Sequence, residues 1–310
     1  MTAVHLAPAS ATPRRPGPGP MPHALLRALD ISISRRIEGL LAGDYRSAQH
    51  GPGTELAQVR PYVPGDDVRR IDWNVTARTG EPHVRLHLAE RVLVTWLVLD
   101  ISPSMGFGTA DRRKADVAEG VALAVGHLGT RHGNKLGVVT FGDADPRSQP
   151  PRQGKQGLLG LLTGLREPEE QDSGPVGATS LGGALARAGA LARQRALVLV
   201  VSDFRGPLDW RLPLLTLSGR HEMIAVEIRD PREQELPNVG ELWLVDPETG
   251  RQLRVDTRST RLRTRFAAAA AEERSVVAQT LGSLGVHHLV LSTEGAWFRD
   301  LALFLRRARV

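Results

Sequence analysis

Residues 92–106 read VLVTWLVLDISPSMG, and this stretch decides the fold. Its first nine residues are mostly apolar and rich in β-branched side chains, which is typical of a strand buried on both faces of a sheet. Polar side chains follow at once, because Asp100, Ser102 and Ser104 come where the strand ends. Open parallel sheets bind their ligands beyond the carboxyl ends of the strands, so this segment predicts a binding crevice.

From residue 90 onward the sequence alternates between predicted strands and predicted helices, which favours an α/β fold with a doubly wound, mostly parallel sheet. Apolar runs predict further strands at residues 135–141, 196–203, 223–228 and 287–291. Helical spacing predicts helices at residues 112–129, 158–165, 179–194, 261–284 and 297–307. A polar loop is expected over 142–154, and an inserted hairpin near 240–256, closed by the turn PETG.

The sequence before residue 90 has a different character. Residues 1–22 are rich in Pro, Gly and Ala, and we expect a disordered tail there. Residues 23–89 combine a predicted helix at 23–43 with a turn-rich segment of alternating apolar residues, which indicates a small β-rich subdomain. The α/β domain is then expected to span residues 90–310.

Composition excludes several classes of function. The 310 residues include no cysteine, so disulfides, cysteine zinc sites and thiol catalysis are ruled out. No apolar run approaches the roughly 20 residues that a membrane-spanning helix needs, and the N-terminus has no secretory signal pattern. We therefore expect a cytoplasmic protein without a membrane span. The net charge of +6 is modest and predicts only weak attraction to anionic partners.

Oxygen-bearing side chains gather at three predicted loops. Asp100, Ser102 and Ser104 follow one strand, Ser202 and Asp203 end another, and Thr179 lies in a Gly-rich entry to a helix. If the two strands are neighbours, the three loops meet. Carboxylate and hydroxyl oxygens suit a small hard cation, so the sequence predicts a Mg²⁺ or Mn²⁺ site.

This arrangement resembles the metal-ion-dependent adhesion site of von Willebrand factor A domains. That site has the pattern Asp-x-Ser-x-Ser on a first loop, Thr on a second and Asp on a third, and the matching residues here are Asp100, Ser102, Ser104, Thr179 and Asp203. The resemblance implies that the three hydroxyls ligate the ion directly and the two carboxylates act through water. It also implies an open coordination position for the acidic side chain of a partner, and hence protein binding rather than catalysis.

A second resemblance lies upstream, where residues 62–73 read YVPGDDVRRIDW and Thr76, Ala77 and Arg78 follow. This string is similar to the signature of the bacterial domain-of-unknown-function family 58, whose members carry a von Willebrand A-like domain. The similarity extends from about residue 25 to the C-terminus. Relatives are often encoded beside MoxR-type AAA+ ATPases, so the resemblance implies an adaptor or co-chaperone that works with such an ATPase on client proteins.

The same signature segment has two interpretations. Arg69, Arg70 and Arg78 could face an acidic partner. Alternatively the segment is a turn held by Asp–Arg pairs, with Trp73 as a packing anchor, and we favour this second interpretation.

The sequence leaves other functions as alternatives. A metal-dependent phosphohydrolase is the first alternative, but the acid that such enzymes place two residues after the first Asp is here Ser102. Neither a GxSxG nucleophile motif nor a GxxxxGK[ST] phosphate loop is present, so no complete catalytic motif supports an enzyme. A nucleic-acid-binding module is the remaining alternative, through the basic run at residues 251–265, although aromatic stacking partners are scarce and Glu272 and Glu273 follow.

Overall fold

The computed structural model describes residues 5–6, 17–21, 56–87, 94–129, 134–142, 147–154 and 180–307. Two compact units divide the chain, one of Met1–Arg36 with Leu93–Val310 and one of Ile37–Val92. The helices predicted at 23–43 and 158–165 and the predicted ligand Thr179 lie outside the described residues.

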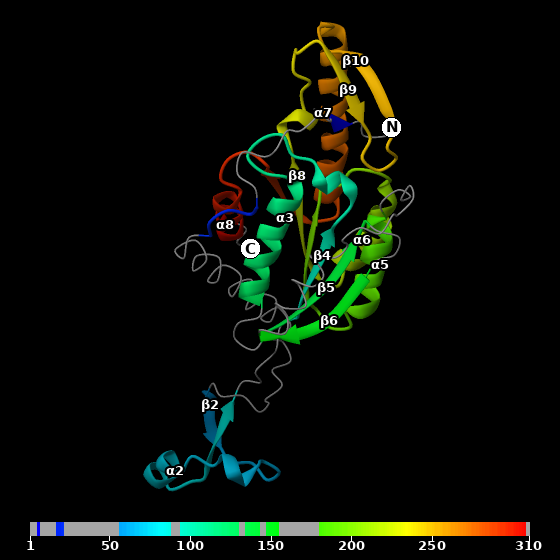
Figure 1. The fold of residues 1–310 in the computed structure, drawn as a ribbon. Coiled ribbons are helices and arrows are strands. Elements are labelled where there is room, and N and C mark those ends of the chain that lie inside the picture. The colour runs from blue at the N-terminus through cyan, green and yellow to red at the C-terminus, as the bar shows by residue number, and fades with distance from the viewer. Residues whose placement is uncertain are drawn as a thin grey trace. The chain divides into compact units, whose positions relative to one another are not determined.

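The larger unit is built on a six-stranded sheet with the strand order β11-β8-β7-β4-β5-β6 (Figure 1). The strands in that order are β11 (His287–Ser292), β8 (Glu222–Arg229), β7 (Leu197–Ser202), β4 (Val94–Asp100), β5 (Lys135–Phe141) and β6 (Arg147–Gln153). All neighbouring pairs are parallel except β5 and β6, which are antiparallel. The chain begins the sheet in its middle at β4 and builds first to one side and then, from β7, to the other. This order confirms the doubly wound α/β fold.

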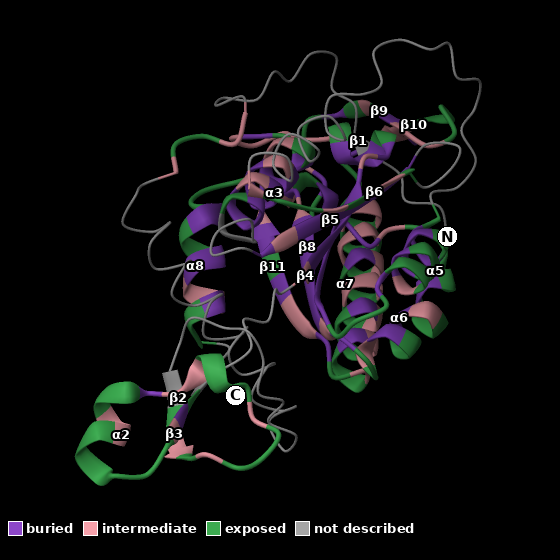
Figure 2. Cartoon of the chain, turned by 90° about the horizontal axis from the view of Figure 1, so that it is seen from below, coloured by how far each residue is buried: buried purple, intermediate pink, exposed green. Residues whose placement is uncertain are grey.

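Helices cover both faces of the sheet. Figures 1 and 2 show α3 (Lys114–Gly129) and α8 (Trp297–Arg307) on one side, and α5 (Leu181–Leu191), α6 (Arg211–Ser218) and α7 (Thr260–Ser283) on the other. Trp96 and Val98 of β4 pack in a core cluster with side chains of α5, α6 and α7. Leu97 and Leu99, which alternate with them, are completely buried as well. Because side chains on both faces of β4 are buried among apolar neighbours, the sequence of this strand is a nearly continuous hydrophobic run.

Strand β6 corrects the sequence prediction, because residues 142–154 were expected to form a loop. Its sequence, RSQPPRQ, has no apolar alternation and contains two prolines. Proline cannot donate a ladder hydrogen bond, so it is tolerated in a strand at a sheet edge, and β6 lies at the edge. The backbone pairing with β5 forms this strand without help from buried side chains.

The predicted hairpin is present as β9 (Glu241–Val245) and β10 (Gln252–Asp256), between β8 and α7. A small hydrophobic cluster holds it, with Leu236 and Leu244 at the centre and Phe107, Leu242, Val255, Leu262 and Phe266 around them. Phe107 belongs to the loop that follows β4. The hairpin is therefore packed against the loop that carries the predicted site.

Parts of the N-terminal segment are ordered, which corrects the expectation of a disordered tail for those residues. Strand β1 (His5–Leu6) pairs antiparallel with β9. The carbonyl oxygen of Gly17 accepts a hydrogen bond from Arg112, and that of Pro18 accepts one from the Trp297 indole. Backbone carbonyls thus attach the Pro/Gly-rich segment to the domain, which the low apolar content of that segment gave no reason to expect.

The smaller unit contains the antiparallel pair β2 (Leu56–Pro61) and β3 (His83–His87), the short helix η1 (Val68–Arg70) and the helix α2 (Trp73–Thr79). Helix α2 begins after Asp72, whose side chain accepts the backbone N–H groups of Asn74 and Val75. It ends at Gly80, which has the left-handed φ of 75° that favours glycine.

The structure contains no helix, within the residues it describes, that is both long enough and apolar enough to cross a bilayer.

Candidate functional site

The candidate site lies where β4 and β7 end side by side. The two strands pair in parallel, with Leu99 opposite Val201, so Asp100 and Ser202 come next to each other at the carboxyl edge of the sheet. The chain turns from one half of the sheet to the other between these strands, which is where doubly wound folds open a crevice. The structure therefore confirms that the first and third predicted loops meet.

Asp100 organises the loop after β4. One carboxylate oxygen accepts a hydrogen bond from the Ser102 backbone N–H at 2.9 Å, and the other accepts one from the Ser202 hydroxyl at 2.6 Å. Burial, and secondly the charge of Asp203, raises the pKa of Asp100 to about 7. The raised pKa means that burial and the charge of Asp203 destabilise the ionised form of the Asp100 carboxylate.

Ser102 and Ser104 point their hydroxyls at each other, with 2.9 Å between the two Oγ atoms. Both residues are almost fully buried. The short helix η2 (Pro103–Gly106) turns the chain between them, and Gly142 packs against the loop from β5. A Cβ on Gly142 would lie 2.3 Å from the Ser102 nitrogen, so only glycine fits there.

The hydroxyl pair passes a simple test for a small cation. An octahedral Mg²⁺ with oxygen ligands at 2.0–2.1 Å holds adjacent ligands about 2.9 Å apart, which is the spacing of these two hydroxyls. Within the described residues no three His, Cys, Asp or Glu side chains gather as a metal site. Helix α5 begins at Leu181, and the side chain of its N-cap, Ser180, accepts the Gly183 N–H.

Asp203 follows directly after β7. One of its carboxylate oxygens accepts a hydrogen bond from the Lys114 ammonium at 2.6 Å, and the other accepts the Arg205 backbone N–H at 3.0 Å. Each carboxylate oxygen can accept a second hydrogen bond, so these contacts do not contradict an action on a metal through water. That role of Asp203 stays a prediction.

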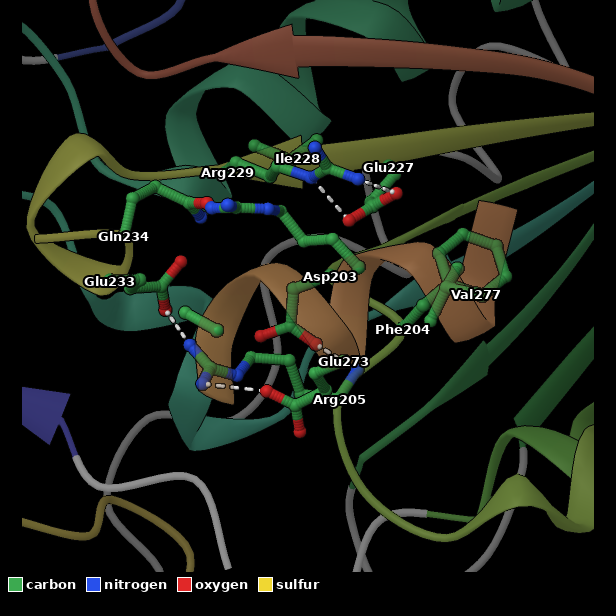
Figure 3. Close-up of a pocket in the computed structure, with 12 residues that line it drawn as sticks. Asp203, Phe204, Arg205, Glu227, Ile228, Arg229, Glu233, Gln234, Glu273 and Val277 are labelled. Atoms are coloured by element: carbon green, nitrogen blue, oxygen red, sulfur yellow. Dashed lines mark hydrogen bonds and ion pairs between the residues drawn. The ribbon is translucent and has the colours of Figure 1, made fainter. Parts of the chain in front are cut away.

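Lys114 and Arg205 form a buried ionic network with three acids. The Lys114 ammonium, which is fully buried, also donates to Glu233 at 2.7 Å. Arg205 pairs with Glu233 and Glu273, as Figure 3 shows. Burial alone would lower the pKa of Lys114, but the charges of Asp203 and Glu233 outweigh it and raise the pKa above its ordinary value. Lys114 therefore stays charged.

Two residues of this region were missed by the sequence analysis. Lys114 follows Arg112 and Arg113 and looks like part of a solvated basic helix start. Glu248, in the turn of the hairpin, accepts the Ser104 backbone N–H at 3.1 Å although 144 positions separate the two residues. No spacing pattern in the sequence connects either residue to the site.

The arginine-rich signature of the smaller unit forms a turn held by Asp–Arg pairs, which is the interpretation that the sequence favours. The pairs are Asp66 with Arg60 and Asp72 with Arg85, each at 2.8 Å. Trp73 is not the expected packing anchor, because 70% of it is exposed. Of the side chains described in this unit, Val84 is the only buried hydrophobic one.

The three predicted partner-binding arginines, Arg69, Arg70 and Arg78, are on this same turn and helix. Arg69 and Arg78 are exposed and Arg70 is half-buried. No ion pair to them occurs among the described residues, and Arg78 only donates to the Asn74 carbonyl.

The basic run at 251–265 is partly used within the protein. Arg254 pairs with Glu241 across the hairpin, and Arg263 donates to the carbonyls of Thr257 and Arg258.

The fold and the site together define a doubly wound α/β protein with a carboxylate and hydroxyl site at the point where its strand order reverses. A family model described as "Protein of unknown function DUF58" matches residues 58–276. The chain belongs to this family.

The chain is also similar to curated proteins and to solved structures. An uncharacterized protein of Mycobacterium bovis and one of Mycobacterium tuberculosis are each 39% identical over 288 residues, which cover 92% of this chain and 89% of theirs. The crystal structure of the conserved hypothetical protein BatB from Bacteroides thetaiotaomicron is 13% identical, with a TM-score of 0.43, over 69% of this chain and 98% of that one. The SpRpn10 VWA domain is 15% identical, with a TM-score of 0.37, over 71% of this chain and 100% of that one. The fold assignment rests on this chain's own strand order.

Proposed function

We propose that this protein is a cation-dependent protein-binding module, whose site beyond β4 and β7 holds Mg²⁺ or Mn²⁺. The observation that carries the proposal is the buried pair of Ser102 and Ser104 hydroxyls, 2.9 Å apart, beside the buried carboxylate of Asp100. Oxygen ligands of this kind and spacing suit a hard divalent cation.

In this proposal each side chain has a distinct role. Ser102 and Ser104 ligate the ion directly, together with the Thr179 hydroxyl. Asp100 fixes the loop through the Ser102 N–H and faces the ion through water. Asp203, held by Lys114, also faces the ion through water. With few charged ligands, the bound ion supplies an electron-poor centre that accepts a carboxylate from a partner.

Binding is favoured over phosphate-ester hydrolysis by what surrounds Asp100. Both of its oxygens accept hydrogen bonds, and Ser102 stands where such an enzyme needs a second acid. The carboxylate of Asp203, which follows β7, is held by Lys114. Turnover of a generic phosphate ester by the wild type, abolished in Asp100→Asn, would favour the enzyme instead.

The proposed partners are a MoxR-type AAA+ ATPase and a client protein with an acidic side chain, in cytoplasmic protein maturation or remodelling. The family resemblance supports the ATPase. Exposed Trp73 with Arg69 and Arg78 supports a second contact surface on the smaller unit, since tryptophan and arginine are the residues most often decisive in protein interfaces.

Thermal unfolding with and without Mg²⁺ or Mn²⁺ tests the cation site. Because a ligand that binds only the folded protein raises its melting temperature, we expect a shift in the wild type that is lost in Ser102→Ala and Ser104→Ala. Ser218→Ala, in α6, is the matched control and should keep the shift. Equal shifts in all four proteins would place the ion elsewhere and contradict the proposal.

A further inference from the structure

Helices α5 and α6 leave an apolar groove between them on the surface of the larger unit. The two helices lie side by side in Figures 1 and 2, and a cavity of about 410 Å³ opens between them. Its walls are mostly apolar, with Ala186, Gly189 and Ala190 from α5 and Leu212, Pro213 and Leu217 from α6. Because these α5 residues have small side chains or none, the two helices do not fill the space between them.

Large apolar side chains beside this groove are exposed to solvent. Leu212, which lines it, is 71% exposed, and Leu215, three positions further along α6 and hence on a neighbouring part of the helix surface, is 52% exposed. Leu191, which follows Ala190 at the end of α5, is 42% exposed. Single exposed leucines are ordinary on a protein surface, but a cavity bordered by exposed leucines on both of its helices is typical of a surface that binds another protein.

The helices around the groove are basic. Residues 181–195 and 208–221, which form and flank α5 and α6, contain one acid and five arginines, namely Arg187, Arg193, Arg195, Arg211 and Arg220. Within the part of the chain that the structure describes, none of the five forms an ion pair, and Arg187 and Arg211 donate instead to the hydroxyls of Ser148 and Thr280. This surface therefore favours an acidic partner.

Three of these arginines gather at one end of the groove. Arg193 and Arg195 lie between α5 and β7, Arg220 lies between α6 and β8, and the two strands are parallel neighbours. Arg220 lines the groove together with His221. Burial, and after it the charges of Arg220 and Arg195, lower the pKa of His221, so both arginines lie close to this side chain. The basic end of the groove is thus at the amino ends of the strands, and the candidate cation site is at their carboxyl ends.

The one acid lies at the opposite end of the two helices. Asp209 accepts a hydrogen bond from the Ser180 hydroxyl at 3.1 Å, and Ser180 is the N-cap of α5. The charge along the groove therefore changes from an acid at the start of α5 to three arginines beyond its end. A helix bound in the groove is expected to have its acidic residues at the arginine end.

We propose that the groove between α5 and α6 binds a partner protein through one amphipathic helix, whose large apolar side chains enter the cavity and whose acidic residues face Arg193, Arg195 and Arg220. A groove between two packed helices receives the ridge of side chains on a third, and apolar residues at positions i, i+3, i+4 and i+7 form such a ridge. Charge complementarity then selects an acidic helix. The inference goes beyond the proposed cation site and does not depend on it, because the groove uses none of that site's residues.

A displayed peptide library tests this surface with the full chain and without a known partner. The library consists of peptides of about 16 residues, just over four helical turns, with leucine fixed at i, i+3, i+4 and i+7 and the other positions randomised. Peptides that bind the wild type are selected, and those that also bind Ala186→Trp, in which the indole fills the cavity, are discarded. We expect the selected peptides to be enriched in Asp and Glu relative to the library.

The affinity of a selected peptide, measured by fluorescence anisotropy, then locates the apolar contact. Leu212→Glu should weaken binding at least about tenfold, because it places a charge on the apolar wall. The position is exposed, so the fold should tolerate the change, and circular dichroism checks this. Leu253→Glu, which changes a 51% exposed leucine of β10, is the matched control and should bind the peptide like the wild type.

A double variant tests the charge. Arg195→Gln with Arg220→Gln should weaken binding about fivefold and reduce its dependence on salt, because screened attraction between opposite charges is lost. Arg306→Gln with Arg307→Gln removes two arginines from the last turn of α8 and should leave both quantities unchanged.

Several results would overturn the inference. No selected peptide, selected peptides without an excess of acidic residues, or equal affinity for the wild type and Leu212→Glu would each do so. A second copy of the chain as the occupant would also overturn it, and would be seen as a dimer in sedimentation that Leu212→Glu dissociates. Ser102→Ala should bind the peptide like the wild type, so the outcome is separate from that of the cation site.

Discussion

Lys114 shows, at the scale of single residues, that part of the site's charge is balanced inside the protein. It is completely buried and reaches two carboxylates, those of Asp203 and Glu233, within 2.7 Å. Removing one member of a buried ionic cluster leaves the other charges uncompensated, which costs far more than the net value of the pair.

The variant Lys114→Met should therefore lower the free energy of unfolding by about 3–5 kcal/mol in urea denaturation. Arg113→Met, which removes the preceding and exposed cation, should change it by less than about 0.5 kcal/mol. Adding Glu233→Gln to Lys114→Met should restore part of the loss. A small effect of Lys114→Met would mean that the buried carboxylates of Asp203 and Glu233 do not depend on this lysine.

At this scale the sequence predicts site residues that are adjacent in the chain, but it does not predict contacts between residues far apart in the chain. Asp100, Ser102 and Ser104 stand out because they are adjacent to a strongly apolar strand. Lys114 meets Asp203 across 89 positions and Glu248 meets Ser104 across 144, and only the folded chain brings these pairs together.

At the scale of secondary structure, the best predictions concern buried strands. Strand β5 was predicted with the residues that the structure shows, and β4, β7 and β8 within about two residues, because full burial leaves a continuous apolar signature. Helix α8 was also predicted with its observed residues, because its buried side chains, Trp297, Leu301 and Leu305 among them, recur at helical spacing. Strand β6 was missed because backbone pairing alone forms it. Helix α2 was missed because seven residues are too few for a periodic pattern, and its caps, Asp72 and Gly80, define it instead.

The cap of α2 also predicts how the smaller unit responds to acid. A hydrogen bond from Arg85, and secondly those from the α2 backbone, lower the pKa of Asp72 from its ordinary 3.8 to about 2 against the opposing effect of burial. Since the folded-state pKa lies below the unfolded one, the ionised carboxylate stabilises the unit above pH 4, and this contribution is lost as the pH falls toward 2.

Hydrogen exchange of peptides from residues 56–87, corrected for intrinsic rates, should therefore show reduced protection at pH 2.5 relative to pH 4.5. In Asp72→Asn the difference between the two pH values should shrink, because the titrating group is gone. An unchanged difference in that variant would assign the acid response to another carboxylate, such as Asp66, whose pKa is lowered by Arg60.

At the scale of the whole molecule, the proposed function assigns a different binding surface to each of the two units. The larger unit places the candidate cation site at the edge of the sheet and packs a hairpin with an acid against it. The smaller unit exposes Trp73 beside arginines that have no ion pair among the described residues. A module that binds one partner through a cation and another through an aromatic and basic surface would serve as an adaptor.

The central claim, that a divalent ion sits on the Ser102 and Ser104 hydroxyls, is tested most directly by anomalous diffraction from crystals grown with Mn²⁺. The account predicts one strong peak within about 2.0–2.3 Å of both hydroxyl oxygens, where the ion replaces their mutual hydrogen bond. Two hydroxyls that remain hydrogen-bonded to each other at saturating Mn²⁺, with no peak beside them, would contradict it.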